Sequence, residues 1–427
     1  MTPSSVQQLA AAGASGAAST DEAWPCQSAE WLPARLVLMC EPRIETLFSI
    51  LQTDSTNFLF PFSLAQAQAE HRAYRAALET RGIRVIDYRE ALMGLSPERD
   101  GSGDEAARAR LERWARAAVN FDFAEALPAE DRLHIQQQLE AALAALDAPS
   151  LVDVMLLRPT LHVTLSADAV DPTTRYTTRF VLAPASPYYT RDPLMTTRAG
   201  VVVTKLRLEK RAPENDLAAH VLESLGITPL YRVTGDGTLE GGDFIPCGDF
   251  VLQGQGLLSN AEGVRQCLEQ RVYGRVEVGV VRDGRLNMDE MHLDTYFAML
   301  DHNLAACVDT RLGGSEQPVV DVYVPEDGAH DYRYVRAHSL PFSSYLTQKG
   351  IHVIPFSKTQ QDNFAANGLL TAPRQLIGVT RAGKPFEDQL RAAGVQTEFI
   401  SFDALTGGYG GPHCSSQVLH RGGIPRT

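Results

Sequence analysis

The sequence predicts an α/β fold built from a repeated unit of helix and strand, with a helical segment inserted after the first unit. Three observations predict it: five segments in which an amphipathic helix, a glycine and an apolar strand follow one another, short apolar strands between these segments, and one stretch dominated by helix-forming residues. The five segments are Ala69–Tyr88 with Gly82, Leu217–Val233 with Gly226, Phe342–Phe356 with Gly350, Pro385–Phe402 with Gly394 and, as a looser match, Glu262–Val281 with Gly274. Five copies of one pattern indicate an internal repeat.

The glycine of each unit stands where its helix is expected to end. Glycine at this position adopts the left-handed conformation that terminates a helix, and the alternating apolar residues after it indicate a half-buried strand. Further strand candidates lie between the units at Arg35–Met39, Arg179–Ala183, Gly200–Leu206, Phe250–Gln253, Ala305–Val308 and Gln375–Val379. The repetition fits a doubly wound sheet, a closed barrel or a radial propeller, and periodicity does not choose among them.

One segment departs from this pattern and defines the domain organisation. Residues 90–152 are rich in Ala, Leu, Glu, Arg and Gln at helical spacing, which predicts a solvated helical insertion without chemistry of its own. Residues 30–89 and 153–427 are then expected to form the α/β domain. Residues 1–29 are rich in Ala, Ser, Gln and Gly and lack the charged and apolar regions of a signal peptide, so we expect a disordered tail.

Composition excludes several functional classes. The 427 residues carry 52 acidic and 39 basic side chains, a net charge of −13 that argues against nucleic acid or an anionic membrane as partner. The six cysteines form no C-x-x-C pair, so neither a zinc site nor a disulfide scaffold is expected, and the cytoplasm is the expected location. No apolar run approaches the ~20 residues of a membrane-spanning helix. Homo-oligomerisation is left open.

A glycine-rich turn at residues 406–417 holds Cys414. Glycine accepts backbone dihedral angles that other residues avoid, so such a turn lets the main chain approach whatever meets the thiol. For a lone cysteine, a buried thiol behind a tight turn is the more common interpretation. Three acidic motifs elsewhere in the chain favour a functional one.

The three motifs are T-R-D-P with Asp192, E-G-G-D with Glu240 and H-x-D with His292 and Asp294. If Asp289–Leu300 begins as a strand, the two residues of H-x-D face the same side. Each motif alone also fits a solvated loop or an exposed turn. Together they supply a thiol, an imidazole and carboxylates, the groups needed to hold a cationic guanidinium, attack its carbon and protonate the leaving amine.

Carboxylates around a thiol oppose its ionisation, because a thiolate would be repelled by them. We therefore expect Cys414 to stay protonated until a cationic substrate enters, so that substrate binding itself activates the nucleophile.

In this order, the four motifs resemble those of arginine deiminase and the wider superfamily of guanidino-group modifying enzymes, whose members end in G-G-x-H-C. The resemblance runs from about Leu32 over nearly all of the chain, including the helical insertion. It implies a five-bladed α/β propeller (pentein) with pseudo-fivefold symmetry around a central substrate site. Five blades would account for the five units.

The resemblance also implies roles for individual residues. Cys414 would attack the guanidino carbon and form a covalent thiouronium-type intermediate, and His292 would protonate the departing amine and then activate water. Asp192 and Asp294 would hold guanidinium nitrogens, and Glu240 would hold the remaining side of the group and orient His292. Asp243 would brace the loop, and His413 would lie outside direct contact with the substrate.

The substrate-recognition positions depart from the family pattern. Ser186, Leu258 and Tyr409 stand where arginine deiminases place an asparagine and two arginines for the amino-acid end of arginine, whereas Arg211 matches a further family arginine. Losing such contacts costs several kcal/mol of recognition, so free arginine is not the expected substrate. Leu258 and Tyr409 favour a less anionic tail.

The resulting prediction is a hydrolase of a small guanidino or amidino compound that uses no metal or organic cofactor. Two alternatives remain open. An amidinotransferase of the same superfamily would use the same thiol and imidazole, and a non-catalytic propeller would only bind a cationic ligand or a protein partner.

Overall fold

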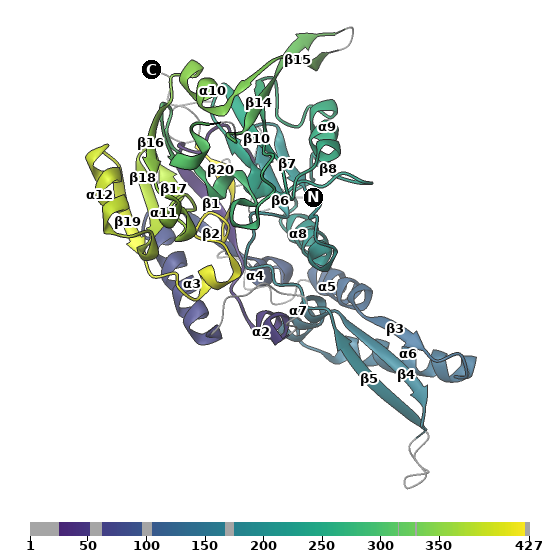
Figure 1. Cartoon of the computed structure of the whole chain (residues 1–427). Helices are drawn as coiled ribbons and strands as arrows, with labels where there is room; N and C mark the ends of the chain where they lie inside the picture. Colours follow the sequence, from purple (N-terminus) through teal and green to yellow (C-terminus); the bar gives the residue numbers. More distant parts are fainter. Residues whose placement is uncertain are drawn as a thin grey trace. The chain divides into compact units, whose positions relative to one another are not determined.

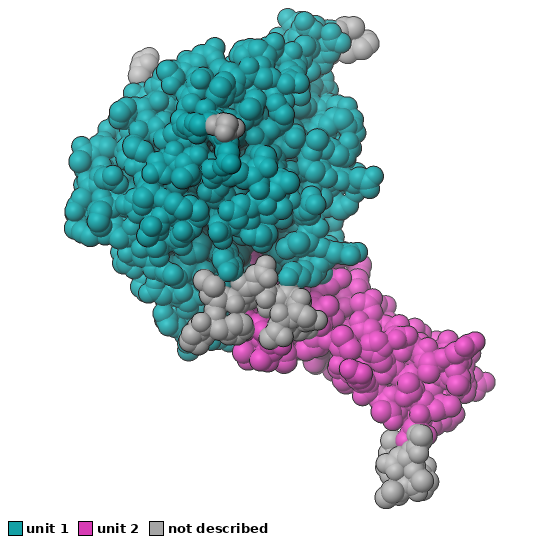
Figure 2. All heavy atoms as spheres, viewed as in Figure 1, with its two compact units in different colours: residues 1–41, 57–87, 188–427 teal, residues 42–56, 88–187 magenta. Residues whose placement is uncertain are grey.

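The computed structural model describes residues 25–51, 62–95, 105–166, 175–314, 316–328 and 331–422 (Figure 1). Contacts divide the chain into two compact units, coloured in Figure 2. The first unit comprises the ranges 1–41, 57–87 and 188–427, and the second comprises 42–56 and 88–187. No helix in the described ranges has both the length and the apolar character needed to cross a membrane.

Five small sheets of the first unit share one plan, in which a central strand has an antiparallel neighbour on one side and a parallel neighbour on the other. Their strands are β20 (Gln417–Arg421), β1 (Ala34–Met39) and β2 (Arg84–Asp87); β6 (Leu194–Thr197), β7 (Gly200–Val203) and β8 (Tyr231–Arg232); β9 (Phe244–Pro246), β10 (Phe250–Gln255) and β11 (Glu277–Arg282); β12 (Phe297–Asp301), β13 (Leu304–Val308) and β16 (His352–Phe356); β17 (Leu369–Ala372), β18 (Gln375–Val379) and β19 (Gln396–Ile400). Separate sheets of this size exclude a single doubly wound sheet and a closed barrel among the described residues.

A helix precedes the parallel outer strand of each of these sheets. The five helices are α3 (Leu64–Glu79), α8 (Ala212–Ser224), α9 (Ala261–Glu269), α10 (Phe342–Gln348) and α12 (Lys384–Ala392). After each helix comes one of the five glycines, Gly82, Gly226, Gly274, Gly350 and Gly394, and all five have φ between 68° and 80°. The predicted repeat of helix, glycine and strand is therefore confirmed in its order. Gly82, Gly226, Gly350 and Gly394 are the left-handed residues that end their helices, whereas α9 ends at Arg271, whose φ is 56°, and Gly274 follows three residues later.

The third sheet carries a long hairpin in addition to the common plan. Its strands β14 (Val319–Asp327) and β15 (Tyr332–Pro341) extend the sheet in the order β15-β14-β11-β10-β9. A short helix, α11 (Lys358–Asp362), follows β16 and begins with a capping box at Ser357.

The first sheet is closed by strands from opposite ends of the chain. Strand β20 pairs antiparallel with β1, with Val418 opposite Val37. Because Cys414 lies three residues before β20, this pairing anchors the glycine-rich turn. The largest apolar cluster of the unit includes Cys414 and side chains from β1, β10, β13 and β18.

The second unit contains helices and one three-stranded sheet. Its elements are α2 (Ile44–Leu51), α4 (Tyr88–Leu92), α5 (Glu105–Ala118), β3 (Asn120–Phe123), α6 (Ala129–Ala145), α7 (Ala148–Leu157), β4 (Pro159–Leu165) and β5 (Tyr176–Leu182). The predicted boundary of the insertion at residue 152 falls inside α7, and the ladder between β3 and β4 joins residues on both sides of it. Composition predicted the helices, and the strand candidate Arg179–Ala183 overlaps β5. Strands β3 and β4, whose pairing joins residues distant in sequence, were missed.

The predicted tail needs a correction at its inner end. Residues 1–24 lie outside the described residues, but residues 25–29 are buried and paired. Cys26 accepts a backbone hydrogen bond from Arg421, and Ala29 forms a β-bridge with Cys247. These contacts join residues hundreds of positions apart, so a composition-based prediction of disorder does not detect them.

Candidate active site

The four sequence motifs meet inside the first unit, although they come from four separate places in the chain. Asp192 lies just before β6, Glu240 before the short 3-10 turn η2 (Gly241–Asp243), His292 and Asp294 at the 3-10 turn η4 (Leu293–Thr295), and Cys414 before β20. None of these five residues is more than 5% exposed to solvent. Burial of this degree excludes the solvated-loop and exposed-turn interpretations of the motifs.

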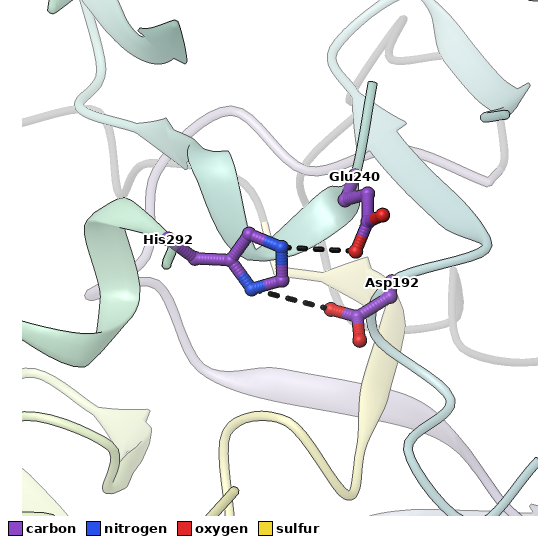
Figure 3. Close-up of side chains that lie close together, drawn as sticks. All are labelled: Asp192, Glu240 and His292. Carbon is purple, nitrogen blue, oxygen red and sulfur yellow. Dashed lines mark hydrogen bonds and ion pairs between the residues drawn. The ribbon is translucent and has the colours of Figure 1, made fainter. Parts of the chain in front are cut away.

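His292 is held between two carboxylates (Figure 3). Its Nε2 donates to Glu240 Oε2 over 3.0 Å, and its Nδ1 lies 3.8 Å from Asp192 Oδ1. Burial opposes protonation of this imidazole, but Asp192 and the hydrogen bond to Glu240 outweigh burial and raise the pKa of His292 to about 10. The imidazole is therefore a cation at neutral pH, with a proton on each nitrogen.

Gly242 makes room for the imidazole of His292. A Cβ atom at Gly242 would stand 2.7 Å from His292 Nδ1 and 3.1 Å from Asp294 Oδ1. No other residue type fits at this distance without moving the ring. The second glycine of E-G-G-D therefore belongs to the site through close approach, not through an unusual backbone angle.

Both carboxylate oxygens of Glu240 have partners. Oε1 accepts from the backbone N–H of Arg207 over 3.0 Å, while Oε2 accepts from His292 and lies 3.7 Å from Arg211 Nη1. Burial pushes the pKa of Glu240 upwards, but these donors and charges overcome it and lower the pKa below its usual value. Glu240 is thus an ionised group committed to neighbours within the protein.

Asp192 shares a guanidinium with Glu214. Arg211 Nη1 donates to Asp192 Oδ2 over 3.0 Å, and Arg211 Nη2 donates to Glu214 Oε2 over 2.8 Å. Burial raises the pKa of Asp192, and it raises the pKa of Glu214 to about 7 although Arg211 opposes both shifts. The other oxygen of Asp192, Oδ1, is buried and has no hydrogen-bond partner among the described residues.

Asp294 connects the glycine-rich turn of Cys414 to the rest of the site. Its Oδ2 accepts from His413 Nδ1 over 2.8 Å and from Cys414 Sγ over 3.6 Å, while its Oδ1 is buried without a hydrogen-bond partner in the described structure. Burial, followed by the charges of Asp294 and Asp192, raises the pKa of the Cys414 thiol well above its usual value. The thiol is therefore protonated in the ligand-free protein.

Asn367 clamps the turn that presents Cys414. Its side-chain oxygen accepts from the backbone N–H groups of Gly411 (2.7 Å) and Cys414 (3.2 Å), its carbonyl accepts from the N–H of His413 (3.0 Å), and its side-chain nitrogen donates to the carbonyl of Asp294 (3.2 Å). One buried amide thereby holds the H-x-D segment and the glycine-rich turn against each other. Sequence reasoning missed Asn367, since it lies in no motif and 47 positions from Cys414.

The glycines of the turn serve a different purpose from the one expected. None of the four glycines at positions 407, 408, 410 and 411 has a positive φ, and the residue of the turn that does is Tyr409, at 72°. A Cβ atom at Gly408 would lie 2.0 Å from the hydroxyl oxygen of Tyr188, and one at Gly410 would lie 2.7 Å from the ring of Tyr189. The glycines are needed because two tyrosines pack against the turn.

The H-x-D segment also differs from its predicted conformation. It forms the 3-10 turn η4 rather than the start of a strand, and β12 begins only at Phe297. Within this turn Leu293 donates its N–H to Asp243 Oδ1 over 2.9 Å. The prediction that Asp243 braces a loop is confirmed by this bond, which ties η2 to η4.

The predicted recognition residues have different environments. Leu258 is buried, and its neighbour Ser259 is the residue of that stretch that reaches the cluster, because Ser259 Oγ accepts from the N–H of Glu240 over 3.0 Å. Tyr409 is partly exposed. Ser186 belongs to the second unit, where its hydroxyl lies 3.5 Å from that of Thr46.

Asp192, Glu240 and His292 also satisfy the spacing of a metal site, since one ligand atom from each lies within 4.8 Å of the others. A metal ligand must be a deprotonated nitrogen, whereas the pKa of His292 is raised to about 10 and its Nε2 already donates to Glu240. Arg211 supplies a cation to the same carboxylates. The donor set therefore fits a protonated imidazole better than a metal ion.

A model of the family described as arginine deiminase matches residues 57–421. This chain belongs to the arginine deiminase family. Among curated members, the arginine deiminase of Halobacterium salinarum is 24% identical over 498 aligned residues, which cover 94% of this chain and 98% of that protein. The arginine deiminase of Pediococcus pentosaceus is 24% identical over 384 residues, covering 83% of this chain and 88% of its own length.

Solved structures with a similar fold extend beyond the arginine deiminase family. A dimethylarginine dimethylaminohydrolase from Pseudomonas aeruginosa, complexed with citrulline, has a TM-score of 0.51 and 14% identity and covers 91% of this chain and 100% of its own. An amidinotransferase from Microseira wollei, in the saxitoxin biosynthetic pathway, has a TM-score of 0.54 and 12% identity and covers 94% and 98% of the two chains. At these identities the comparison establishes the fold alone.

Proposed function

We propose that this member of the arginine deiminase family is a cysteine-dependent hydrolase of a carbon–nitrogen bond in a guanidino or amidino compound. The observation that carries the proposal is the pair of buried carboxylate oxygens, Asp192 Oδ1 and Asp294 Oδ1, that lack a hydrogen-bond partner among the described residues and belong to the two carboxylates that perturb the Cys414 thiol. Unpaired buried acceptors are costly, so they favour a ligand that donates to both. A planar guanidinium, with its fixed N–H donors, is such a ligand.

Binding of this cation would also activate the nucleophile. A guanidinium between Asp192 and Asp294 neutralises the two charges that oppose ionisation of Cys414, and the thiol then releases its proton to water in the pocket. The thiolate attacks the central carbon of the substrate and forms a tetrahedral adduct.

His292 supplies the proton for the departing amine. Its Nε2 is engaged by Glu240, so Nδ1, on the side of Asp192, delivers the proton as the carbon–nitrogen bond breaks. A thiouronium-type adduct remains on the sulfur. The neutral imidazole then takes a proton from water, and the resulting hydroxide adds to the carbon. The carbon–sulfur bond breaks, the hydroxyl proton passes to solvent water, and a ureido product is released with the thiolate restored.

Glu240 has a narrower role in this scheme than a direct substrate contact. Since both of its oxygens already accept hydrogen bonds, we assign it to holding His292 protonated and oriented. The guanidinium contacts then come from Asp192 and Asp294.

We further propose that the preferred substrate carries a less anionic tail than arginine. Arg211 is the one family arginine retained here, and Glu214 and Asp192 already balance its charge. Ser186, Leu258 and Tyr409, at the other recognition positions, supply no counter-charge for a carboxylate.

We also propose that the five sheets of shared plan are blades of a propeller around this site. Each blade would consist of the antiparallel, central and parallel strands described above, with its helix between the last two. Support comes from the family and from the similarity in fold to the two solved structures.

A screen of guanidino and amidino compounds with the purified protein tests the proposed reaction. The expected result is release of ammonia or an amine together with a ureido product, and a covalent adduct at Cys414 after acid quenching, read by mass spectrometry. Cys414→Ala should abolish both signals. Product that forms only when an acceptor amine is added would instead establish an amidinotransferase, and turnover by Cys414→Ala would exclude nucleophilic catalysis by the thiol.

A further inference from the structure

His413 lies beside the nucleophile and shares an acceptor with it. His413 Nδ1 and Cys414 Sγ both donate to Asp294 Oδ2, over 2.8 Å and 3.6 Å respectively. The imidazole makes the shorter bond, so it sets the position of this oxygen. The second oxygen of the same carboxylate, Oδ1, is left unpaired and buried.

The imidazole of His413 is fixed on both of its nitrogen edges. Its Nε2 lies 3.6 Å from Glu30 Oε1, and Glu30 is in turn held by Arg421 Nη2 (2.9 Å) and by the side-chain nitrogen of Gln27 (2.7 Å). The backbone carbonyl of His413 accepts from Arg191 Nε over 3.3 Å. Glu30 and Gln27 belong to the N-terminal segment beside the bridge at Ala29, so this end of the chain contributes to the site.

A carboxylate can rotate about its Cα–Cβ and Cβ–Cγ bonds, and a rotation of Asp294 would exchange the oxygen that faces the substrate. The bond from His413 prevents this rotation because it holds Oδ2 on the side of the nucleophile turn. The same bond gives His413 the closer approach to Oδ2 and leaves the thiol with the longer contact of 3.6 Å. The Cys414 thiol is therefore bound only weakly to Asp294, from which it must separate when it ionises.

We propose that His413 is a positioning residue, which holds Asp294 Oδ2 through Nδ1 so that Oδ1 faces the guanidinium of the substrate. This inference rests on the proposed function. It predicts that a donor at the place of Nδ1 is needed, whereas a donor at the place of Nε2 cannot replace it.

Two amide substitutions separate these positions. The side-chain nitrogen of asparagine occupies approximately the place of Nδ1, and that of glutamine approximately the place of Nε2. His413→Asn is therefore expected to stay within a few-fold of the wild-type kcat/KM. His413→Gln and His413→Leu should lose about 10- to 100-fold, the effect of removing one hydrogen bond to a charged group, mainly through a higher KM.

Thermal unfolding of each variant shows whether it folds, and the comparison uses the folded ones. A folded His413→Gln or His413→Leu with wild-type kcat/KM overturns the inference, as does an equal loss in the asparagine and glutamine variants. A second measurement is the 15N spectrum of histidine-labelled protein, in which the signal lost in His413→Asn should show a protonated Nδ1. A lone-pair Nδ1 would overturn the inference.

Failure of the proposed function is distinguishable from failure of this inference. If wild-type protein turns over no guanidino or amidino compound, the proposed function fails. If the wild type is active and the asparagine and glutamine variants do not differ, only the role of His413 fails.

Discussion

Replacing Glu240 by glutamine should lower the pKa of His292 and move the alkaline limit of catalysis with it. The side chains have the same shape, so Glu240→Gln removes the charge that His292 Nε2 meets over 3.0 Å and leaves an amide in its place. A hydrogen bond to a charged group contributes about 1.5–3 kcal/mol, which corresponds to a fall of about one to two pH units in the pKa of His292.

The shift should be partial because a second carboxylate remains. Asp192 Oδ1 lies 3.8 Å from His292 Nδ1, and it is the largest contribution favouring the protonated imidazole. His292 in the variant should therefore still titrate above its ordinary value. In the proposed mechanism the protonated imidazole gives its proton to the leaving amine, so the alkaline fall of kcat should begin about one to two pH units lower than in the wild type.

Two assays check this prediction. The pH dependence of kcat with the best substrate from the screen reports the active form, and an NMR titration of labelled histidine reports His292 directly and needs no turnover. Glu45→Gln is the matched control, since Glu45 is a buried carboxylate hydrogen-bonded to Arg89 in the second unit. An unchanged His292 titration in Glu240→Gln, or an equal fall in the control, would refute the reasoning.

Three further predictions follow from single contacts. Gly242→Ala should displace the ring of His292 and lower kcat at least about tenfold, with a stability cost of about 1–3 kcal/mol, while Gly284→Ala, where a Cβ meets nothing within 4 Å, should change neither kcat nor the urea midpoint. His71 is buried in α3 with no hydrogen-bond partner on either ring nitrogen in the described structure, and burial lowers its pKa to about 3, so stability should be complete above pH 6.5 and fall as the pH drops towards 3. Urea titrations at several pH values between 6 and 4 give the free energy of unfolding as a function of pH. Its slope should be smaller in His71→Leu than in the wild type by up to about 1.4 kcal/mol per pH unit, and an identical slope would show that His71 is not the group that titrates. Treatment with EDTA followed by gel filtration should leave kcat unchanged, because a protonated His292 cannot ligate a metal; loss of activity that zinc or another divalent cation restores would reverse that conclusion.

Local chemistry made several features of this protein predictable from the sequence. Four of the five glycines, all except Gly274, end their helices with the left-handed backbone angle that this position implied, because the requirement arises within one helix end and needs no distant partner. The motif residues Asp192, Glu240, His292, Asp294 and Cys414 were recognisable for a related reason. Their chemical types complement one another, and chemical type is written in the sequence itself.

Other features depended on contacts between residues far apart in the chain. The clamp by Asn367, the bond from His413 to Asp294 and the burial of residues 25–29 join segments separated by tens to hundreds of positions. The local conformational preferences of residues do not specify such pairs, because the partners come into contact only when the sheets have assembled. For the same reason, β3 was missed in a segment whose composition indicates helix, and so was its partner β4.

The contrast between what sequence and structure reveal is clearest at the cluster of Asp192, Glu240, His292, Asp294 and Cys414. The order of amino acids specifies which groups are available: a thiol, an imidazole and carboxylates suited to a cation. The distribution of their hydrogen bonds arises from folding. The folded structure fills both oxygens of Glu240, leaves one oxygen each on Asp192 and Asp294 without a partner, and raises the pKa of Cys414 by burial among negative charges. Hydrogen-bond saturation and desolvation depend on the positions of all neighbours at once, and these positions exist only in the folded chain.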